Sequence, residues 1–238
     1  MNLLDEERAN FINGLKFDIN KLSLFVKDDY YDGMRCAFRD AFSQYAHREG
    51  IKYADNVNEL MKPVVDRLFR YFNDDNDSFS ACFQECIELT KNIFNNNRYG
   101  LAQKFINMSY KYLMCYGDSY KCEQKFKDCH MPLDKYTILW IKKLDKGIND
   151  RLNKIHYSWV NIDENLYKDI QNMITSKLNS NYEYIITYNK QVSLNTCILP
   201  KNKLYAEFVI WHQEQINEIY KMIEKAEPDF DRLGIEWR

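Results

Sequence analysis

Glycine and proline are scarce in this chain, which has 7 glycines and 4 prolines among 238 residues. The closely spaced turns of a many-stranded sandwich or barrel usually depend on these two residues, so such folds are disfavoured. Apolar residues make up 45% of the chain, which is enough to build a core. We therefore predict an all-α, two-lobed helical bundle. It would form a single helical domain over residues 1–238, with one lobe built from residues 1–97 and 161–238 and the other from residues 98–160.

Signals for secretion, membrane insertion and metal binding are also missing. No run approaches the roughly 18 apolar residues of a membrane helix, and the first residues, MNLLDEERANF, are acidic and contain no apolar segment. The seven cysteines are odd in number, which favours reduced thiols in a cytoplasmic protein. Cys115, Cys122, Cys129 and His130 lack the close cysteine pair of structural zinc sites. We expect no metal, no cofactor, no membrane contact and a monomer.

The charges of the chain are unevenly distributed. Residues 98–160 carry 12 basic and 6 acidic side chains, whereas residues 1–97 carry 12 and 17, and residues 161–238 carry 9 and 12. A basic middle segment between acidic flanks is typical of a site for a polyanion such as DNA. The same pattern would also arise from a solvated, lysine-rich helical face, and composition alone leaves both interpretations open.

Apolar residues at helical spacing mark most of the expected elements. The predicted helices span residues 28–48, 53–72, 79–94, 99–116, 132–145, 163–178 and 203–226, the last of them ending at Pro228. Residues 117–131 form a long connection that could contain a helical turn. For residues 182–188 the pattern permits either a strand or a helix. Glu207 lies on a largely apolar helix, so we expect it to be buried and paired.

Lys104 is the first of two residues that suggest chemistry. It lies at the edge of the apolar stripe formed by Leu101, Phe105, Met108 and Tyr112 on the helix predicted over residues 99–116. Partial burial would disfavour the charged amine and lower its pKa, and only a neutral amine is a nucleophile. The alternative is a lysine that lays its methylenes along the core and keeps its ammonium group in water.

Asp134 is the second residue. Pro132 is well suited to the first turn of a helix, which would place Asp134 near the helix N-terminus, where free N–H groups stabilise a carboxylate. An ionised carboxylate can stabilise positive charge on a sugar during glycosidic cleavage and can help to deprotonate an attacking amine. The alternative is an ordinary helix-capping aspartate.

Together these segments resemble a known family. Ala102-Gln103-Lys104 on an aromatic-rich helix, followed about thirty residues later by Met131-Pro132-Leu133-Asp134, is similar to the helix-hairpin-helix DNA glycosylases, and most of all to the archaeal 8-oxoguanine DNA glycosylase type. The resemblance covers about residues 98–145. It implies a Schiff-base nucleophile at Lys104, a catalytic carboxylate at Asp134, and excision of a damaged base such as 8-oxoguanine from double-stranded DNA in base excision repair.

The resemblance also implies a flipped base held between helical lobes, with strand nicking by β-elimination. Candidate base contacts are Gln103, Asn107, His130, Trp140 and Trp159. Candidate phosphate contacts are Lys111, Lys121, Lys125, Lys127, Lys142 and Lys143. The glycosylases' Gly-x-Gly hairpin and four-cysteine iron–sulfur signature are absent from this sequence, which allows a different target, such as a modified base of viral DNA in antiviral defence.

Two other functions fit the sequence. One is a non-enzymatic helical interaction module of a defence system. The other is an RNase of the HEPN type, suggested by Arg151 and His156, which are separated by four residues. Covalent trapping on DNA, RNA cleavage, or inertness toward both polymers would distinguish the three hypotheses.

Overall fold

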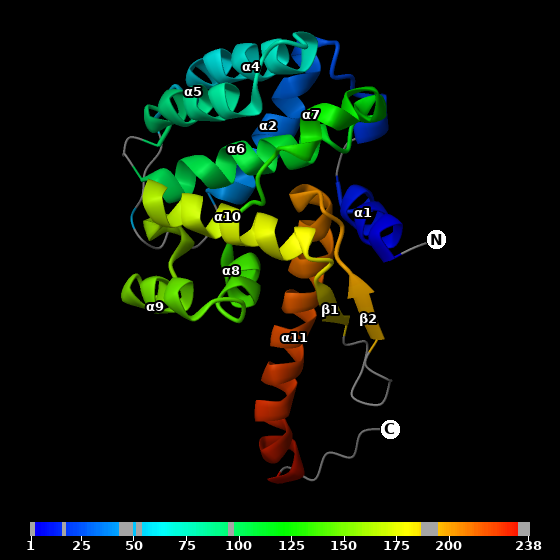
Figure 1. Ribbon diagram of the computed structural model, residues 1–238, viewed down its shortest axis with the longest axis vertical. Coiled ribbons are helices and arrows are strands. Elements are labelled where there is room, and N and C mark those ends of the chain that lie inside the picture. The colour runs from blue at the N-terminus through cyan, green and yellow to red at the C-terminus, as the bar shows by residue number, and fades with distance from the viewer. Residues whose placement is uncertain are drawn as a thin grey trace.

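The computed structural model describes residues 3–15, 18–42, 50, 54–94, 98–186 and 195–232, and it is almost entirely helical (Figure 1). The α-helices are α1 (Leu3–Asn13), α2 (Tyr30–Ala41), α4 (Val57–Asn73), α5 (Phe79–Lys91), α6 (Tyr99–Leu113), α7 (Glu123–Lys127), α8 (Lys135–Ile141), α9 (Lys146–Lys154), α10 (Glu164–Asn179) and α11 (Lys203–Arg232). The 3-10 turns are η1 (Ile19–Lys21), η2 (Lys27–Asp29), η3 (Ser119–Cys122) and η4 (Trp159–Asn161). The all-α prediction is confirmed.

The two strands, β1 (Glu183–Ile186) and β2 (Asn195–Ile198), form a small antiparallel hairpin in which Glu183 pairs with Ile198. The strand alternative is therefore correct for the described part of residues 182–188. Within the described ranges, none of the helices combines the length and the apolar character that a membrane span requires.

Helix α6 is the centre of the molecule. Every residue from Gly100 to Leu113 on it is buried; α2 and α5 pack against it, and α10 crosses close by (Figure 1). The 3-10 turn η4 approaches the start of α6 so closely that a Cβ at Gly100 would lie 2.1 Å from the Trp159 carbonyl oxygen. Gly100 therefore permits the approach that places Trp159 beside the next turn of α6.

Polar side chains define several helix starts. Ser78 caps α5 by accepting from the Ala81 N–H at 3.2 Å, and Asp163 caps α10 by accepting from the Leu166 N–H at 2.8 Å. Residues 117–131 do contain helical turns, η3 and α7. Residues 43–48 of the helix predicted over residues 28–48 lie outside the described residues.

Two predicted helix boundaries were wrong. The helix expected over residues 132–145 is the shorter α8, which begins after its cap Asp134 and ends at Ile141. The next helix, α9, begins after its own cap Asp145 and was not predicted. Helix α11 continues through Pro228 to Arg232. A proline removes only one hydrogen bond of the ladder and need not end a helix when the turns on either side remain bonded; α4 likewise contains Pro63.

Helix α11 packs with its N-terminal half against the body of the molecule. Helices α1 and α8 pack against it, and its C-terminal half extends past the hairpin, away from the other helices (Figure 1). Its N-terminal half is buried from Leu204 to Ile210 with the exception of Tyr205, which is partly buried. This half of α11 therefore forms a wall that faces α6 and α8.

Candidate active site

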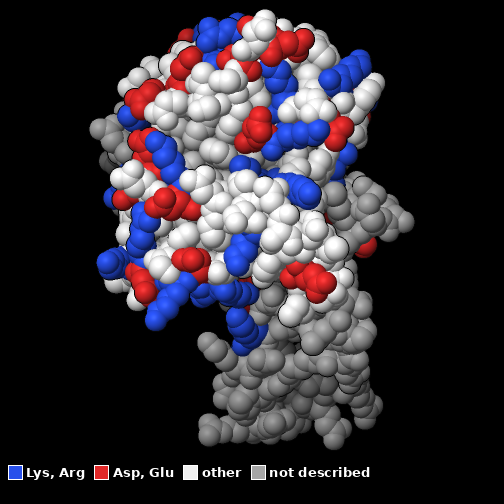
Figure 2. Space-filling model, viewed as in Figure 1, with Lys and Arg blue, Asp and Glu red and all other residues white. Residues whose placement is uncertain are grey.

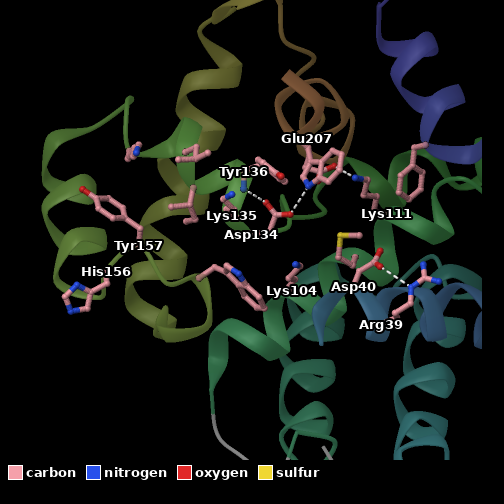
Figure 3. A pocket seen from close by; sticks show the side chains of 17 residues that line it. Arg39, Asp40, Lys104, Lys111, Asp134, Lys135, Tyr136, His156, Tyr157 and Glu207 are labelled. Atoms are coloured by element: carbon pink, nitrogen blue, oxygen red, sulfur yellow. Dashed lines mark hydrogen bonds and ion pairs between the residues drawn. The ribbon is translucent and has the colours of Figure 1, made fainter. Parts of the chain in front are cut away.

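A cavity of about 1010 Å³ lies among α1, α2, α6, α8, α11 and the turn between α9 and η4. Its volume is at the upper end of the roughly 300–1,000 Å³ that is usual for small-molecule sites. Lys104 and Asp134 both line it, and Figure 3 shows their side chains facing the same space. The two residues that the sequence analysis singled out for chemistry therefore lie together, although thirty residues separate them in the chain.

The Lys104 side chain projects from the middle of α6 and is only 7% exposed. Because the side chain is almost completely buried and its Nζ lies over the Trp159 indole, the ammonium group is not in bulk water, so the alternative of a snorkelling lysine is wrong. Desolvation lowers the pKa of Lys104, while the negative charges of Asp134, Asp40 and Glu207 oppose this effect. A lowered pKa increases the fraction of neutral, nucleophilic amine near neutral pH.

The Lys104 amine makes neither a hydrogen bond nor an ion pair with the part of the chain that the structure describes. Its nearest defined partner is the face of the Trp159 indole, whose centroid lies 4.4 Å from Nζ. Such a cation–π contact orients an ammonium group without consuming its protons in hydrogen bonds. The amine therefore remains available to a ligand in the cavity.

Asp134 is the N-cap of α8. Its Oδ1 accepts from the Tyr136 and Thr137 backbone N–H groups at 2.9 and 3.1 Å, while the Thr137 hydroxyl accepts from the Asp134 N–H at 2.8 Å. This reciprocal capping box fixes the side chain at the positive end of the helix dipole. The expected position of Asp134 near the helix N-terminus is confirmed, although the helix begins at Lys135 rather than at Pro132.

The second carboxylate oxygen of Asp134 has a different partner. Its Oδ2 accepts from the Trp211 indole Nε1–H at 3.0 Å, so α11 and the start of α8 together hold the carboxylate. Trp211 also lines the cavity. No ion pair joins Asp134 to Lys104 in the described structure, although they share the cavity. The site thus holds an amine and a carboxylate in one cavity without an ion pair between them.

Gln103 explains how Asp134 comes to lie near α6. The Gln103 amide brackets the Leu133 peptide: Nε2 donates to the Leu133 carbonyl at 3.0 Å, and Oε1 accepts from the Leu133 N–H at 3.3 Å. Gln171 on α10 holds the Met131 peptide in the same way, at 2.8 and 3.2 Å. These two side chains satisfy the backbone of an extended, buried segment and fix the approach of Asp134 to the cavity.

Of the residues predicted to contact a base, Trp159 alone lines the cavity. Gln103 and Asn107 are fully buried and bonded to each other, and Asn107 also donates to the Tyr167 hydroxyl at 2.9 Å. Trp140 is a core residue that packs on Tyr182. A polar or aromatic residue on a helix that is buried on all sides looks the same in sequence whether it faces a cavity or the core.

His130 also lies away from the cavity. It packs against Phe79 and Phe83, and its Nδ1 lies 2.8 Å from the Tyr167 hydroxyl. Burial, together with the charge of Lys203, lowers the pKa of His130 to about 3. Its place in the structure is that of a neutral core histidine.

This histidine should make the fold sensitive to acid. Below pH 6.5, the ordinary pKa of histidine, the unfolded chain takes up a proton that the folded chain refuses until about pH 3, so stability falls as pH falls. Between pH 6.5 and about 5 the loss is about 2 kcal/mol. Urea unfolding of wild type and His130→Gln at both pH values should show a smaller difference for the variant. His156→Gln, at an exposed histidine, should keep the wild-type difference; equal differences in all three proteins would contradict this assignment.

The lysines predicted to contact phosphates have different surroundings. Lys111 is buried and pairs with Glu207 at 2.5 Å, so it faces the cavity rather than solvent. Lys125 donates to the Asp74 and Asp77 carbonyls, and Lys143 pairs with Glu214 at 2.7 Å. Lys121, Lys125 and Lys127 belong to η3 and α7, at the far end of α6 from α8 and α9 (Figure 1).

Lys142 is the one residue of that group, apart from Lys111, that lines the cavity. It lies just beyond α8, and its Nζ is 5.3 Å from the Tyr157 ring centroid. Figure 2 shows Lys and Arg side chains along the edge of the body formed by α8 and α9. Lys142, Lys146 and Lys154 make no ion pair with any described residue. Three cations at this edge are therefore free to meet a polyanion.

Sequence reasoning missed several cavity residues, of which Asp40, Arg39 and Trp211 bear most on its chemistry. Asp40 and Arg39, at the end of α2, pair with each other, and Asp40 accepts from the Tyr112 hydroxyl at 2.7 Å. Trp211 lies on the helix predicted over residues 203–226 but was not singled out as a site residue. Glu207 is buried and paired with Lys111, as expected. Glu207 and Trp211 lie four residues apart, on one face of α11. A polar residue, Glu207, within an apolar stripe was the only feature of the sequence that indicated a cavity wall on this helix.

Unlike Lys104 and Asp134, the two residues of the HEPN pattern, Arg151 and His156, do not both line the cavity. His156 lines the cavity, but the Arg151 guanidinium pairs at the surface with Asp169 on α10, at 2.5 Å. Arg151 is not among the residues of the cavity wall. The structure thus separates the two side chains that this motif would have to join.

No family model matches the chain, and no curated protein or solved structure matches it either. Function is therefore inferred from the cavity and its side chains.

Proposed function

We propose that the chain is a DNA glycosylase that removes a damaged or modified base through a Schiff base on Lys104, assisted by Asp134. One observation carries the proposal: a buried amine without an ion pair and a carboxylate fixed at a helix N-terminus line one cavity of about 1010 Å³. The resemblance to helix-hairpin-helix DNA glycosylases, read from the same two residues, suggests 8-oxoguanine as the first substrate to test and a modified base of viral DNA as the second.

The amine and the acid have separate tasks. As the glycosidic bond lengthens, positive charge develops on the sugar, and the Asp134 carboxylate stabilises it. Neutral Lys104 attacks C1′, and the base leaves with the bonding electrons and takes up one amine proton. The second amine proton goes to O4′ as the sugar ring opens, which leaves an imine between C1′ and Nζ. Loss of the 3′ phosphate by β-elimination would then nick the strand.

The remaining cavity side chains suit an extruded base. Trp159 and Trp211 provide aromatic faces for stacking. The Glu207 carboxylate is fully buried, and its Oε1 has no hydrogen-bond partner among the described residues. A buried acceptor without a partner is unfavourable, and an N–H donor on a base edge would satisfy it. Lys142, Lys146 and Lys154 at the α8–α9 edge would meet the DNA phosphates.

The decisive experiment is covalent trapping. We would mix the protein with duplexes that carry one 8-oxoguanine or one abasic site, add borohydride, and look for an adduct on a denaturing gel. Wild type should be trapped on both duplexes, because borohydride reduces the imine to a stable secondary amine. Lys104→Gln should abolish the adduct, since glutamine cannot form an imine.

A matched lysine serves as the control. Lys203 is also buried, with its pKa lowered by desolvation, but it is outside the cavity wall. Lys203→Gln should therefore retain trapping. An adduct that persists in Lys104→Gln would remove Lys104 as the nucleophile, and wild type that forms no adduct with the abasic duplex would refute the glycosylase proposal.

A further inference from the structure

Trp211 gives the Asp134 carboxylate a partner other than the nearby amine. The indole Nε1–H donates to Asp134 Oδ2 at 3.0 Å, and the ring is held edge-on against Tyr136, with centroids 5.2 Å apart. Oδ1 is already engaged by the N-terminal N–H groups of α8. Both carboxylate oxygens are therefore directed toward protein donors that do not react.

Without such donors, an amine and a carboxylate in one poorly solvated cavity would attract each other strongly. An ion pair would favour the charged form of Lys104, which cannot attack a sugar carbon. In the structure the two groups form no ion pair, because Trp159 faces the amine at 4.4 Å while Trp211 holds the acid.

We infer that Trp211 is a positioning residue that holds Asp134 apart from Lys104, an inference that rests on the proposed function. In this arrangement the carboxylate stabilises the sugar and the amine stays free to attack. The indole belongs to α11, whereas Asp134 belongs to the start of α8 and Lys104 to α6. Helix α11 thus sets the distance between two reacting groups that it does not itself carry.

The charged groups around Lys104 determine how its pKa would respond to a substitution of Trp211. Asp134 at the start of α8, Asp40 on α2 and Glu207 on α11 raise its pKa, whereas Lys111 on α6 lowers it. Asp40 is engaged by Arg39 and the Tyr112 hydroxyl, and Glu207 is engaged by Lys111. Asp134 is therefore the carboxylate whose release by a Trp211 substitution would change the charge state of Lys104.

The test is Trp211→Phe, which keeps an aromatic wall and removes the N–H donor. Single-turnover base release from the 8-oxoguanine duplex should slow about 10- to 100-fold, as loss of a hydrogen bond to a charged group predicts. The rate of borohydride trapping on the abasic duplex should reach its half-maximum at higher pH than in wild type. In an Asp134→Asn background, Trp211→Phe should cause little further loss of base release, because the two residues act as one unit.

Trp140→Phe is the matched control, because Trp140 is buried, its Nε1 has no hydrogen-bond partner in the described structure, and it is outside the cavity wall. It should keep the wild-type pH profile. A readout independent of activity is the Trp211 indole resonance in ¹⁵N NMR, which should move in Asp134→Asn.

The outcomes separate this inference from the proposed function. If wild type releases the base but Trp211→Phe matches it in rate and pH profile, the positioning role is refuted and the glycosylase proposal stands. If the Trp211 resonance does not respond to Asp134→Asn, the hydrogen bond itself is refuted. If wild type neither releases a base nor forms an abasic adduct, the proposed function fails, and the positioning role fails with it.

Discussion

Asp134→Asn is expected to slow base release by about 10²–10⁴-fold while the protein stays folded. The substitution removes the negative charge that would stabilise the sugar cation, but asparagine is as good an N-cap as aspartate. Its amide oxygen can still accept from the Tyr136 and Thr137 N–H groups that Asp134 Oδ1 now engages. The measurement is the single-turnover rate of base release from the 8-oxoguanine duplex, together with the melting temperature.

Asp163→Asn is the control for this experiment. Asp163 is likewise the N-cap of its helix, accepting from the Leu166 N–H at 2.8 Å, and does not line the cavity. Asp163→Asn should lose little stability and Asp134→Asn somewhat more, because its amide N–H would face the Trp211 indole N–H. Base release should fall in Asp134→Asn alone. If both variants release the base at the wild-type rate, Asp134 is only a helix cap, and the catalytic role assigned to it is wrong.

Most of the helices could be predicted from sequence because each has an apolar stripe or a capping side chain of its own, whereas α1 and α9 were not predicted. Ser78 and Asp163 start α5 and α10 where their side chains predict. Helix α9 was missed because its capping aspartate, Asp145, was assigned to the end of the preceding helix rather than to the start of a new one. Local signals therefore define helices well, and they fail where two such signals overlap.

Two of the cavity residues, Lys104 and Asp134, could be singled out from the sequence, but most of the others could not. Lys104 and Asp134 stand in a recognisable local context, whereas Asp40 and Trp211 enter the cavity from helices that are distant in sequence. Whether a buried polar residue faces a cavity or the core depends on which helices pack against it. Gln103 and Lys104 are neighbours on α6, yet Gln103 binds the Leu133 peptide and Lys104 faces the cavity.

The Lys111–Glu207 pair should be the most destabilising place to remove a charge. Both side chains are almost completely buried, and they pair at 2.5 Å. Lys111→Met would leave the Glu207 carboxylate buried without its partner, which costs about 3–5 kcal/mol of unfolding free energy at neutral pH. Lys62→Met, at an exposed pair with Glu59, should leave the unfolding free energy almost unchanged.

Two further measurements identify buried charge as the cause. The double variant Lys111→Met/Glu207→Leu should recover most of the lost stability, because it removes both charges and leaves an apolar wall. Burial raises the pKa of Glu207 above its ordinary 4.5, and without Lys111 it would rise further. The folded variant then holds a proton that the unfolded chain releases above about pH 4.5, so its stability falls as pH rises through this window. Urea unfolding at pH 5 and pH 8 should therefore show a smaller penalty for Lys111→Met at pH 5, and an equal penalty at both would mean that lost packing, rather than the orphaned carboxylate, is responsible.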